Sequence, residues 1–295
     1  MPELPDIVVY IEALEKRVLD EEITGFRVAS PAVLRTYDPM YTAVVGEKVA
    51  GFDRIGKRIV FELTNDLWLV IHLMIAGRFR WFDQPKKAIP KKVGLAALDF
   101  PNGTLILTEQ GTKKRAGIWV LGDRESVDAE NRGGVEPLDV GLEGFAEAIT
   151  AENRTLKRAL TDQRIFSGIG NAFSDEILWE ARLSPVKRTG QLDEEEIARL
   201  HQAVQTSLQH WTQLLREQTG DDFPSKVTAF RPEMATHGKF KEPCPRCGTA
   251  IQRIVYSSNE TNYCPTCQTG GKILADRSLS RLLKDDWPST VDELE

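Results

Sequence analysis

The sequence predicts an α+β protein with a β-rich N-terminal half, a helical segment and a C-terminal hairpin that carries cysteines. Between about residues 22 and 120, short β-prone runs alternate with turn residues, which is typical of a β-sandwich or barrel. From about residue 142 the apolar pattern becomes helical. All four cysteines lie between residues 244 and 267, so they do not form a dispersed disulfide framework.

The bulk composition is that of a soluble globular chain. It has 295 residues, 41% of them hydrophobic and 28% charged, enough for two domains or one large one. We find no secretion signal and no apolar run of roughly 20 residues, and therefore expect a cytoplasmic protein. The net charge of −6 counts mildly against a nucleic-acid partner but does not exclude one, because basic residues cluster locally, as in 154–164.

The first six residues admit two interpretations. Removal of Met1 would leave Pro2 with a free secondary amine, and an α-amino group titrates at about pH 7.7–8.0. Such an amine can attack an aldehyde-like carbon, and Glu3 beside it is a candidate acid/base. Alternatively, Pro2 and Pro5 only begin a helix, whose apolar face would be Ile7, Ile11, Leu14 and Val18. On these residues alone the helix interpretation has the better support.

The β-prone runs follow this helix in order. They cover 23–28, 59–63, 67–73, 79–82, 95–100 and 105–108. Between the last two, Pro101-Asn102-Gly103 predicts a hairpin turn in which Asn-Gly supplies positive φ angles.

The second half is predicted to be helical after a polar linker at 126–141. Its longest helix begins near Asp193, which would be the N-cap with Glu196 as its capping-box partner. The apolar face of this helix is Ile197, Leu200, Val204, Leu208, Trp211 and Leu215. We expect a loop at about 220–241 and a helical tail at 276–285.

Two Cys-x2-Cys pairs predict a metal site. Cys244 and Cys247 precede Cys264 and Cys267 by a spacing typical of tetrahedral zinc held by four thiolates. Four sulfur ligands leave no open position, so the one zinc ion is structural.

A glycine-rich turn precedes another predicted helix. Gly168-Ile169-Gly170-Asn171 would present backbone N–H groups and an amide at a helix N-terminus, which is a suitable site for an anion such as phosphate. An ordinary turn between two helices explains the motif equally well.

Taken together, Pro2-Glu3-Leu4-Pro5, Lys57, Gly168 to Asn171 and the four-cysteine hairpin resemble the formamidopyrimidine-DNA glycosylase / endonuclease VIII family of base-excision repair enzymes. The resemblance covers essentially the whole chain. It implies an N-terminal catalytic β-sandwich domain (1–125), a linker (126–141), a helix-two-turn-helix DNA-binding domain (142–222), a loop (223–241), a zinc finger (242–275) and a C-terminal tail (276–295).

The resemblance also implies roles for individual residues. Pro2 would be the nucleophile that attacks C1′ of the damaged nucleotide, with Glu3 as acid/base and Lys57 as a catalytic and phosphate-binding lysine. Lys157 and Asn171 would bind phosphate, and Glu176 would be a buried carboxylate that supports the site. The reaction would be base excision followed by β,δ-elimination through a Schiff base.

The chain departs from the family at Asp6, in a shorter segment 220–240, and at four positions expected to contact the DNA. The zinc-finger hairpin carries Asn259 where the family has an arginine that reaches the DNA phosphate; Arg253, Lys272 or Arg277 could substitute. Ile75 occupies the place of a methionine that fills the space of the flipped base. Lys114 replaces an arginine, and Ala116 replaces a phenylalanine wedge.

We therefore expect a monomeric enzyme that acts on damaged DNA, duplex or single-stranded, at the bacterial nucleoid and not at a membrane. The altered positions favour an endonuclease VIII-like substrate, single strands or unusual lesions over 8-oxoguanine opposite cytosine. One alternative is a lesion- or structure-specific DNA-binding protein that has lost base excision. Another, a zinc-ribbon protein-interaction factor, accounts only for the last quarter of the chain.

Overall fold

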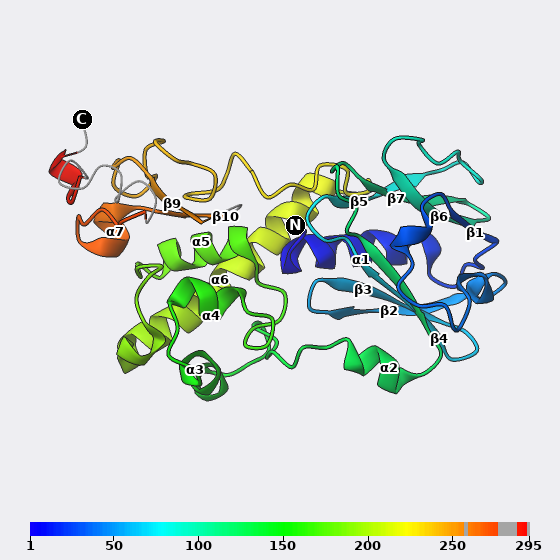
Figure 1. Cartoon of the computed structure of the whole chain (residues 1–295), viewed down its shortest axis with the longest axis horizontal. Helices are drawn as coiled ribbons and strands as arrows, with labels where there is room; N and C mark the ends of the chain where they lie inside the picture. The colour runs from blue at the N-terminus through cyan, green and yellow to red at the C-terminus, as the bar shows by residue number, and fades with distance from the viewer. Residues whose placement is uncertain (257–258, 277–287, 294–295) are drawn as a thin grey trace. The chain divides into compact units, whose positions relative to one another are not determined.

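In a computed structural model of the chain, the structure describes residues 1–256, 259–276 and 288–293. These residues form two compact units (Figure 1). The sandwich unit contains residues 1–132 and 211–228, and the helical unit contains residues 133–210 and 229–295. Among the described helices, none combines the length and the apolar character that crossing a membrane requires.

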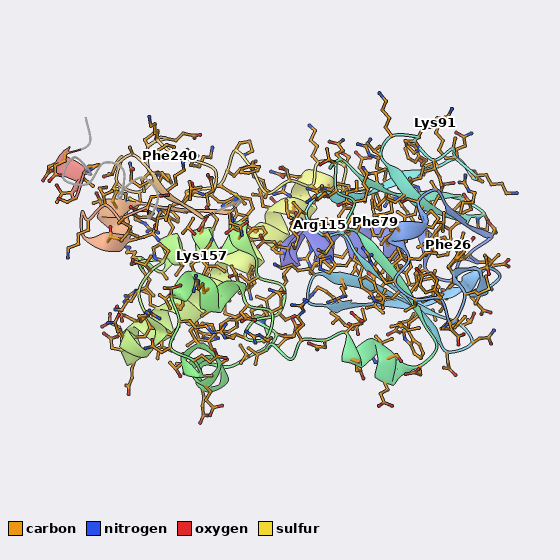
Figure 2. All side chains as sticks on the ribbon, viewed as in Figure 1. Phe26, Phe79, Lys91, Arg115, Lys157 and Phe240 are labelled. Atoms are coloured by element: carbon orange, nitrogen blue, oxygen red, sulfur yellow. The ribbon has the colours of Figure 1, made fainter. Side chains whose placement is uncertain are left out.

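The sandwich unit contains two antiparallel four-stranded sheets, as predicted. The first has the order β1 (Gly25–Val28), β6 (Gly94–Phe100), β7 (Gly103–Glu109), β5 (Gly77–Phe82). The second has the order β2 (Val49–Ile55), β3 (Arg58–Leu63), β4 (Leu67–His72), β8 (Gly117–Leu121). Side chains of both sheets share one hydrophobic core, to which Phe26 and Phe79 (labelled in Figure 2) belong.

Strands β2 and β8 had not been predicted as β-prone runs. Strand β2 contains Gly51 and Asp53, which have low β propensity, and its pairing with β3 compensates for them. The hairpin between β6 and β7 is present, but the predicted turn geometry is wrong. Phe100 pairs with Gly103, and neither Asn102 nor Gly103 has a positive φ. Gly103 is required for another reason, because a Cβ there would lie 2.3 Å from Cζ2 of Trp81.

Helix α1 (Leu4–Val18) packs in the same core, with Ile7, Leu14 and Val18 completely buried, as the periodicity predicts. A short helix, α2 (Arg124–Ala129), begins after Asp123, whose side chain accepts a hydrogen bond from the Ser126 N–H. The first residues of the segment expected to be a linker, 126–129, are thus helical.

The helical unit contains α3 (Leu142–Thr150), α4 (Leu156–Thr161), α5 (Asn171–Glu180) and most of α6 (Glu194–Thr219). The predicted capping box of α6 is confirmed: the Glu196 N–H donates to Asp193, and the Asp193 N–H donates to Glu196. The predicted cysteine hairpin is β9 (Gln252–Tyr256) and β10 (Asn259–Tyr263), followed by α7 (Pro265–Thr269). Four single-turn 3-10 helices are η1 (Pro31–Val33), η2 (Tyr41–Val44), η3 (Thr189–Gln191) and η5 (Val291–Glu293) among the described residues. Of the predicted tail helix (276–285), all residues except Asp276 lie outside the described residues.

Candidate functional site

The N-terminus of the chain is folded into the sandwich unit. Pro2 and Glu3 are buried, and Glu3 is only 3% exposed. The Glu3 N–H donates a 2.9 Å hydrogen bond to the Asp6 carboxylate in the first turn of α1. Both interpretations of this stretch are therefore compatible with the fold, because the residues begin a helix and are also held in a fixed position.

Burial lowers the pKa of the α-amino group of Met1 below its usual value. Glu3 and Asp6 oppose this decrease, whereas the positive charges of Arg78 and Lys57 add to it. Lys57 lies in the two-residue turn between β2 and β3, where Gly56 has φ +60°, and is 8% exposed. The fold thus brings Glu3 and Lys57 into electrostatic contact with the amine of Met1, the residue that directly precedes Pro2.

Ile75 lies in the turn between β4 and β5 and is 53% exposed. Met74 before it has φ +55°, and its N–H donates a 2.9 Å hydrogen bond to Nδ1 of His72. Burial, with the charges of Arg58 and Lys57, lowers the pKa of His72 to about 3, so the ring is neutral and carries its proton on Nε2. A half-buried histidine therefore holds the turn that displays Ile75.

Lys114 and Ala116 lie in the segment before β8. The side chain of Glu109, 1% exposed, accepts hydrogen bonds from the N–H groups of Arg115 (2.8 Å) and Ala116 (3.1 Å). Ala116 is 2% exposed and packs in the sandwich core, while exposed Lys114 donates from its ammonium to the Glu109 carbonyl. Ala116 is thus a core residue and does not present a side chain that could insert between base pairs.

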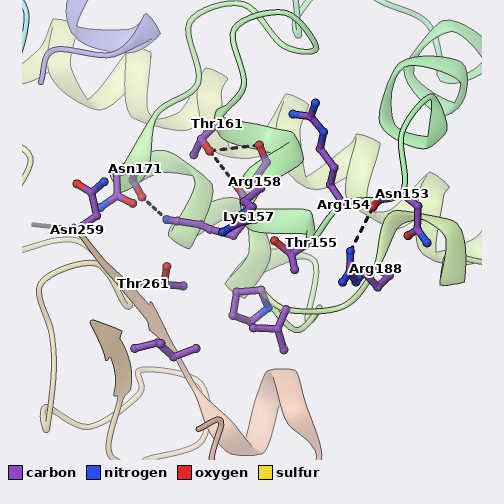
Figure 3. Close-up of a pocket in the computed structure, with 13 residues that line it drawn as sticks. Asn153, Arg154, Thr155, Lys157, Arg158, Thr161, Asn171, Arg188, Asn259 and Thr261 are labelled. Carbon is purple, nitrogen blue, oxygen red and sulfur yellow. Dashed lines mark hydrogen bonds between the residues drawn. The ribbon is translucent and has the colours of Figure 1, made fainter. Parts of the chain in front are cut away.

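In the helical unit, Lys157, Asn171 and Asn259 line one cavity of about 600 Å³ (Figure 3). They come from α4, α5 and β10. None of the described residues that line the cavity is acidic. The other lining residues are Asn153, Arg154, Thr155, Arg158, Thr161, Pro185, Val186, Arg188, Ile254 and Thr261. A chain with a net charge of −6 thus has a locally cationic cavity, suited to an anion.

Asp175 on α5 connects the walls of this cavity. Its completely buried carboxylate lies 2.5 Å from Nζ of Lys157 and 2.7 Å from Nδ1 of His237. It also accepts a 3.1 Å hydrogen bond from the Asn262 N–H of β10. Lys157 in addition donates to the Asn171 carbonyl at 2.6 Å (Figure 3). One carboxylate therefore holds α4, β10 and the loop that carries His237 against α5.

The amide of Asn171 donates a 3.0 Å hydrogen bond to the Glu260 carbonyl and so attaches the hairpin to the start of α5. The expected anion-binding turn is partly used within the chain, because the Gly168 N–H donates to Oε1 of Gln163 at 3.0 Å. Glu176, 5% exposed, accepts hydrogen bonds from the N–H groups of Ala235, Thr236 and His237.

The four cysteines form the predicted metal site. Their sulfur atoms all lie within 4.8 Å of one another, with Cys244 and Cys267 4.0 Å apart and Cys247 and Cys264 3.4 Å apart. Tetrahedral zinc with Zn–S bonds of about 2.3 Å separates its sulfurs by about 3.8 Å, so the donor set fits one structural zinc ion. Nε1 of Trp179 donates a 3.3 Å hydrogen bond to Sγ of Cys244, a contact that stabilises a thiolate.

Sequence reasoning gave no individual role to Asp175, Arg158, Arg188 or His237. In the structure His237 is 3% exposed and stacks on Phe230, with ring centroids 5.5 Å apart. The spacing of Asp175, four residues after Asn171 on one helix face, was the available signal.

Three family models match the chain. They describe the formamidopyrimidine-DNA glycosylase N-terminal domain (residues 1–112), its H2TH domain (134–219), and a zinc finger found in FPG and IleRS (241–270). The formamidopyrimidine-DNA glycosylase of Lactococcus lactis subsp. cremoris is 30% identical and that of Thermus thermophilus is 32% identical. The two alignments cover 91% and 92% of this chain, and 99% and 100% of the relatives.

Solved structures agree with this result. A complex between Lactococcus lactis Fpg and DNA containing an abasic site matches with a TM-score of 0.80 and 27% identity, over 90% of this chain and 99% of that one. A complex of the same organism's Fpg with DNA containing an oxidized pyrimidine also has a TM-score of 0.80, at 27% identity, and covers 91% of this chain and 100% of that one.

Proposed function

The chain belongs to the formamidopyrimidine-DNA glycosylase family of base-excision repair enzymes, and we propose that it uses the amine of Pro2 both to excise a damaged base and to cleave the abasic strand. The observation that carries this proposal is the placement of Pro2: it is buried beside Glu3 at the start of α1, and the charges of Glu3 and Lys57 act on the chain terminus next to it. A neutral amine has the lone pair that attack on C1′ requires.

In the proposed reaction, the nitrogen of Pro2 bonds to C1′ as the bond from C1′ to the base breaks. Glu3 transfers protons at the sugar as its ring opens, and an iminium forms between Pro2 and C1′. Loss of a proton from C2′ then expels the 3′ phosphate, and a second elimination expels the 5′ phosphate. Water finally hydrolyses the iminium and releases Pro2. Lys57, buried near the amine, would bind a phosphate of the same nucleotide.

The other residues that the family resemblance assigns to DNA binding lie in several different parts of the chain. Lys157, Asn171 and Asn259 line a cationic cavity, which supports their role as phosphate ligands. Ile75 is exposed on the turn that the hydrogen bond from Met74 to His72 holds, and it would enter the space of the flipped base. Lys114 is exposed on the loop before β8 and would reach the DNA by exchanging its hydrogen bond to the Glu109 carbonyl for one to the DNA. We assign catalysis to residues 1–125, DNA binding to 142–222 and the zinc finger to 242–275.

Borohydride trapping on oligonucleotides with one abasic site, single-stranded and duplex, tests the active site. We expect a covalent adduct that Pro2→Gly loses and that Glu3→Gln slows about 100-fold or more. Glu15→Gln, an exposed glutamate on the same helix, is the matched control and should trap like wild type. Unchanged trapping in both active-site variants would show that the assignment is wrong.

A lesion-binding protein without base excision is the second candidate. Asn259 in place of an arginine and the burial of Ala116 favour it. Tight binding to damaged DNA without any adduct, from protein shown to begin at Pro2, would establish it.

A further inference from the structure

The cavity in the helical unit lacks one positive charge that the family resemblance leads us to expect there, because Asn259 is neutral. Lys157 does not make up the difference, since its ammonium already faces the Asp175 carboxylate at 2.5 Å. A phosphate that enters the cavity must find its counter-charge on another side chain.

The substitutes suggested by the sequence do not lie there. Arg253 pairs with Glu260 at 3.2 Å and covers the ring of Phe240, 4.3 Å from its centroid. Neither Arg253 nor Lys272 lines the cavity. Arg277 falls outside the described residues.

Among the described residues, three arginines line the cavity, and their ion pairs distinguish them. Arg154 forms salt bridges with Asp162 and Glu152, so its charge is balanced. Arg158 and Arg188 are exposed and form no salt bridge with any residue that the structure describes. Arg188 donates one hydrogen bond to the Asn153 carbonyl at 3.2 Å, which leaves most of its N–H groups available (Figure 3).

We propose that Arg158 and Arg188 are phosphate-binding residues of this cavity and that they supply the positive charge which Asn259 does not. Arg158 directly follows Lys157 on α4, and Arg188 lies on the segment that leads to α6, so the two guanidinium groups extend the cationic wall beyond Lys157 and Asn171. A guanidinium also provides the two parallel N–H donors that a phosphate accepts and an asparagine amide does not. This inference rests on the proposed function, because the phosphates are those of the DNA substrate.

The salt dependence of DNA affinity tests the proposal. The dissociation constant would be measured by fluorescence anisotropy at several salt concentrations, with duplex DNA that carries a non-cleavable abasic analogue. Each phosphate contact contributes about 0.9 to the slope of log affinity against log salt. We expect Arg158→Gln and Arg188→Gln each to lower the slope by about one, and the double variant by about two.

Two further variants make the test specific. Arg253→Gln is the matched control, since its charge is paired outside the cavity, and it should keep the wild-type slope. Asn259→Arg in the Arg158→Gln background should restore the lost contact, because it returns a guanidinium to the same cavity. Melting temperatures would confirm that each variant is folded.

An unchanged slope in the folded double variant would overturn the proposal, as would an equal loss in Arg253→Gln. Borohydride trapping with the Pro2→Gly variant tests the catalytic assignment independently of the salt dependence of DNA binding. If Pro2→Gly still forms the adduct while the arginine variants lose slope, the catalytic assignment fails and the phosphate assignment stands.

Discussion

The ammonium of Lys157 lies 2.5 Å from Oδ1 of Asp175, a carboxylate with no exposed surface. The pair joins α4 to α5 next to the start of α5, where Lys157 also donates to the Asn171 carbonyl. Lys157 is therefore fixed before any phosphate arrives, and its position depends on a residue that does not line the cavity.

Asp175→Asn should lower the free energy of unfolding by about 3–5 kcal/mol, because it leaves the buried ammonium of Lys157 without its counter-charge. Urea unfolding measures this change. Asp221→Asn is the control, because Asp221 forms an exposed ion pair with Lys16 at 3.2 Å whose loss should cost less than about 1 kcal/mol. Equal effects of the two variants would contradict a structural role for Asp175.

Arg78→Gln should shift the pH profile of borohydride trapping to higher pH. Burial lowers the pKa of the amine of Met1, and the charge of Arg78 lowers it further. The amine of Pro2, one residue along the chain, would experience the same charge, so we expect Arg78→Gln to raise the pKa of the reacting amine. At neutral pH a smaller fraction of the amine is then neutral, and the adduct forms more slowly. Arg80→Gln, on the same strand, is the control and should leave the pH profile of trapping unchanged. A shifted profile in both variants, or in neither, would contradict a specific role of the Arg78 charge.

His72 should make the fold less stable in mild acid. Burial lowers the pKa of His72 to about 3, whereas the unfolded side chain titrates near pH 6.5. Between these values the unfolded state binds one more proton, so stability falls as the pH falls, by at most about 1.4 kcal/mol per pH unit.

His72→Asn keeps an acceptor for the Met74 N–H but does not titrate. Urea unfolding at pH 7, 6 and 5 should therefore show a smaller loss of stability in this variant than in wild type. Parallel losses in the two proteins would assign the pH dependence to other groups.

Removal of zinc should unfold the hairpin of β9 and β10 and abolish DNA binding. Zinc would join two segments whose shared apolar cluster is small: Cys244, Ile251 and Cys264, with Trp179 and Cys267 packed against it. Mercurial titration should release one zinc per chain and change the fluorescence of Trp179, which donates to Cys244. Intact DNA affinity after complete zinc release would contradict this prediction.

Much of the architecture could be predicted from local sequence. The Asp193–Glu196 capping box, the apolar face of α1 and the two cysteine pairs all depend on residues close together in the chain. Strands β2 and β8 were not predicted, for different reasons. Strand β2 contains Gly51 and Asp53, residues of low β propensity, and becomes a strand by pairing with β3. Strand β8 is short and β-prone, and its partner β4 lies far away in the sequence.

The sequence by itself determined the classes of chemistry: an N-terminal proline with an adjacent glutamate, a four-thiolate metal site, and cations near a glycine-rich turn. Only the tertiary structure decided which of those groups are available. It pairs Arg154 with Asp162, Arg253 with Glu260 and Lys157 with Asp175, while Arg158 and Arg188 have no ion-pair partner among the described residues. The reason is physical: the chain fixes the type of each charge, but its counter-charge lies on a segment that only folding brings within about 4 Å.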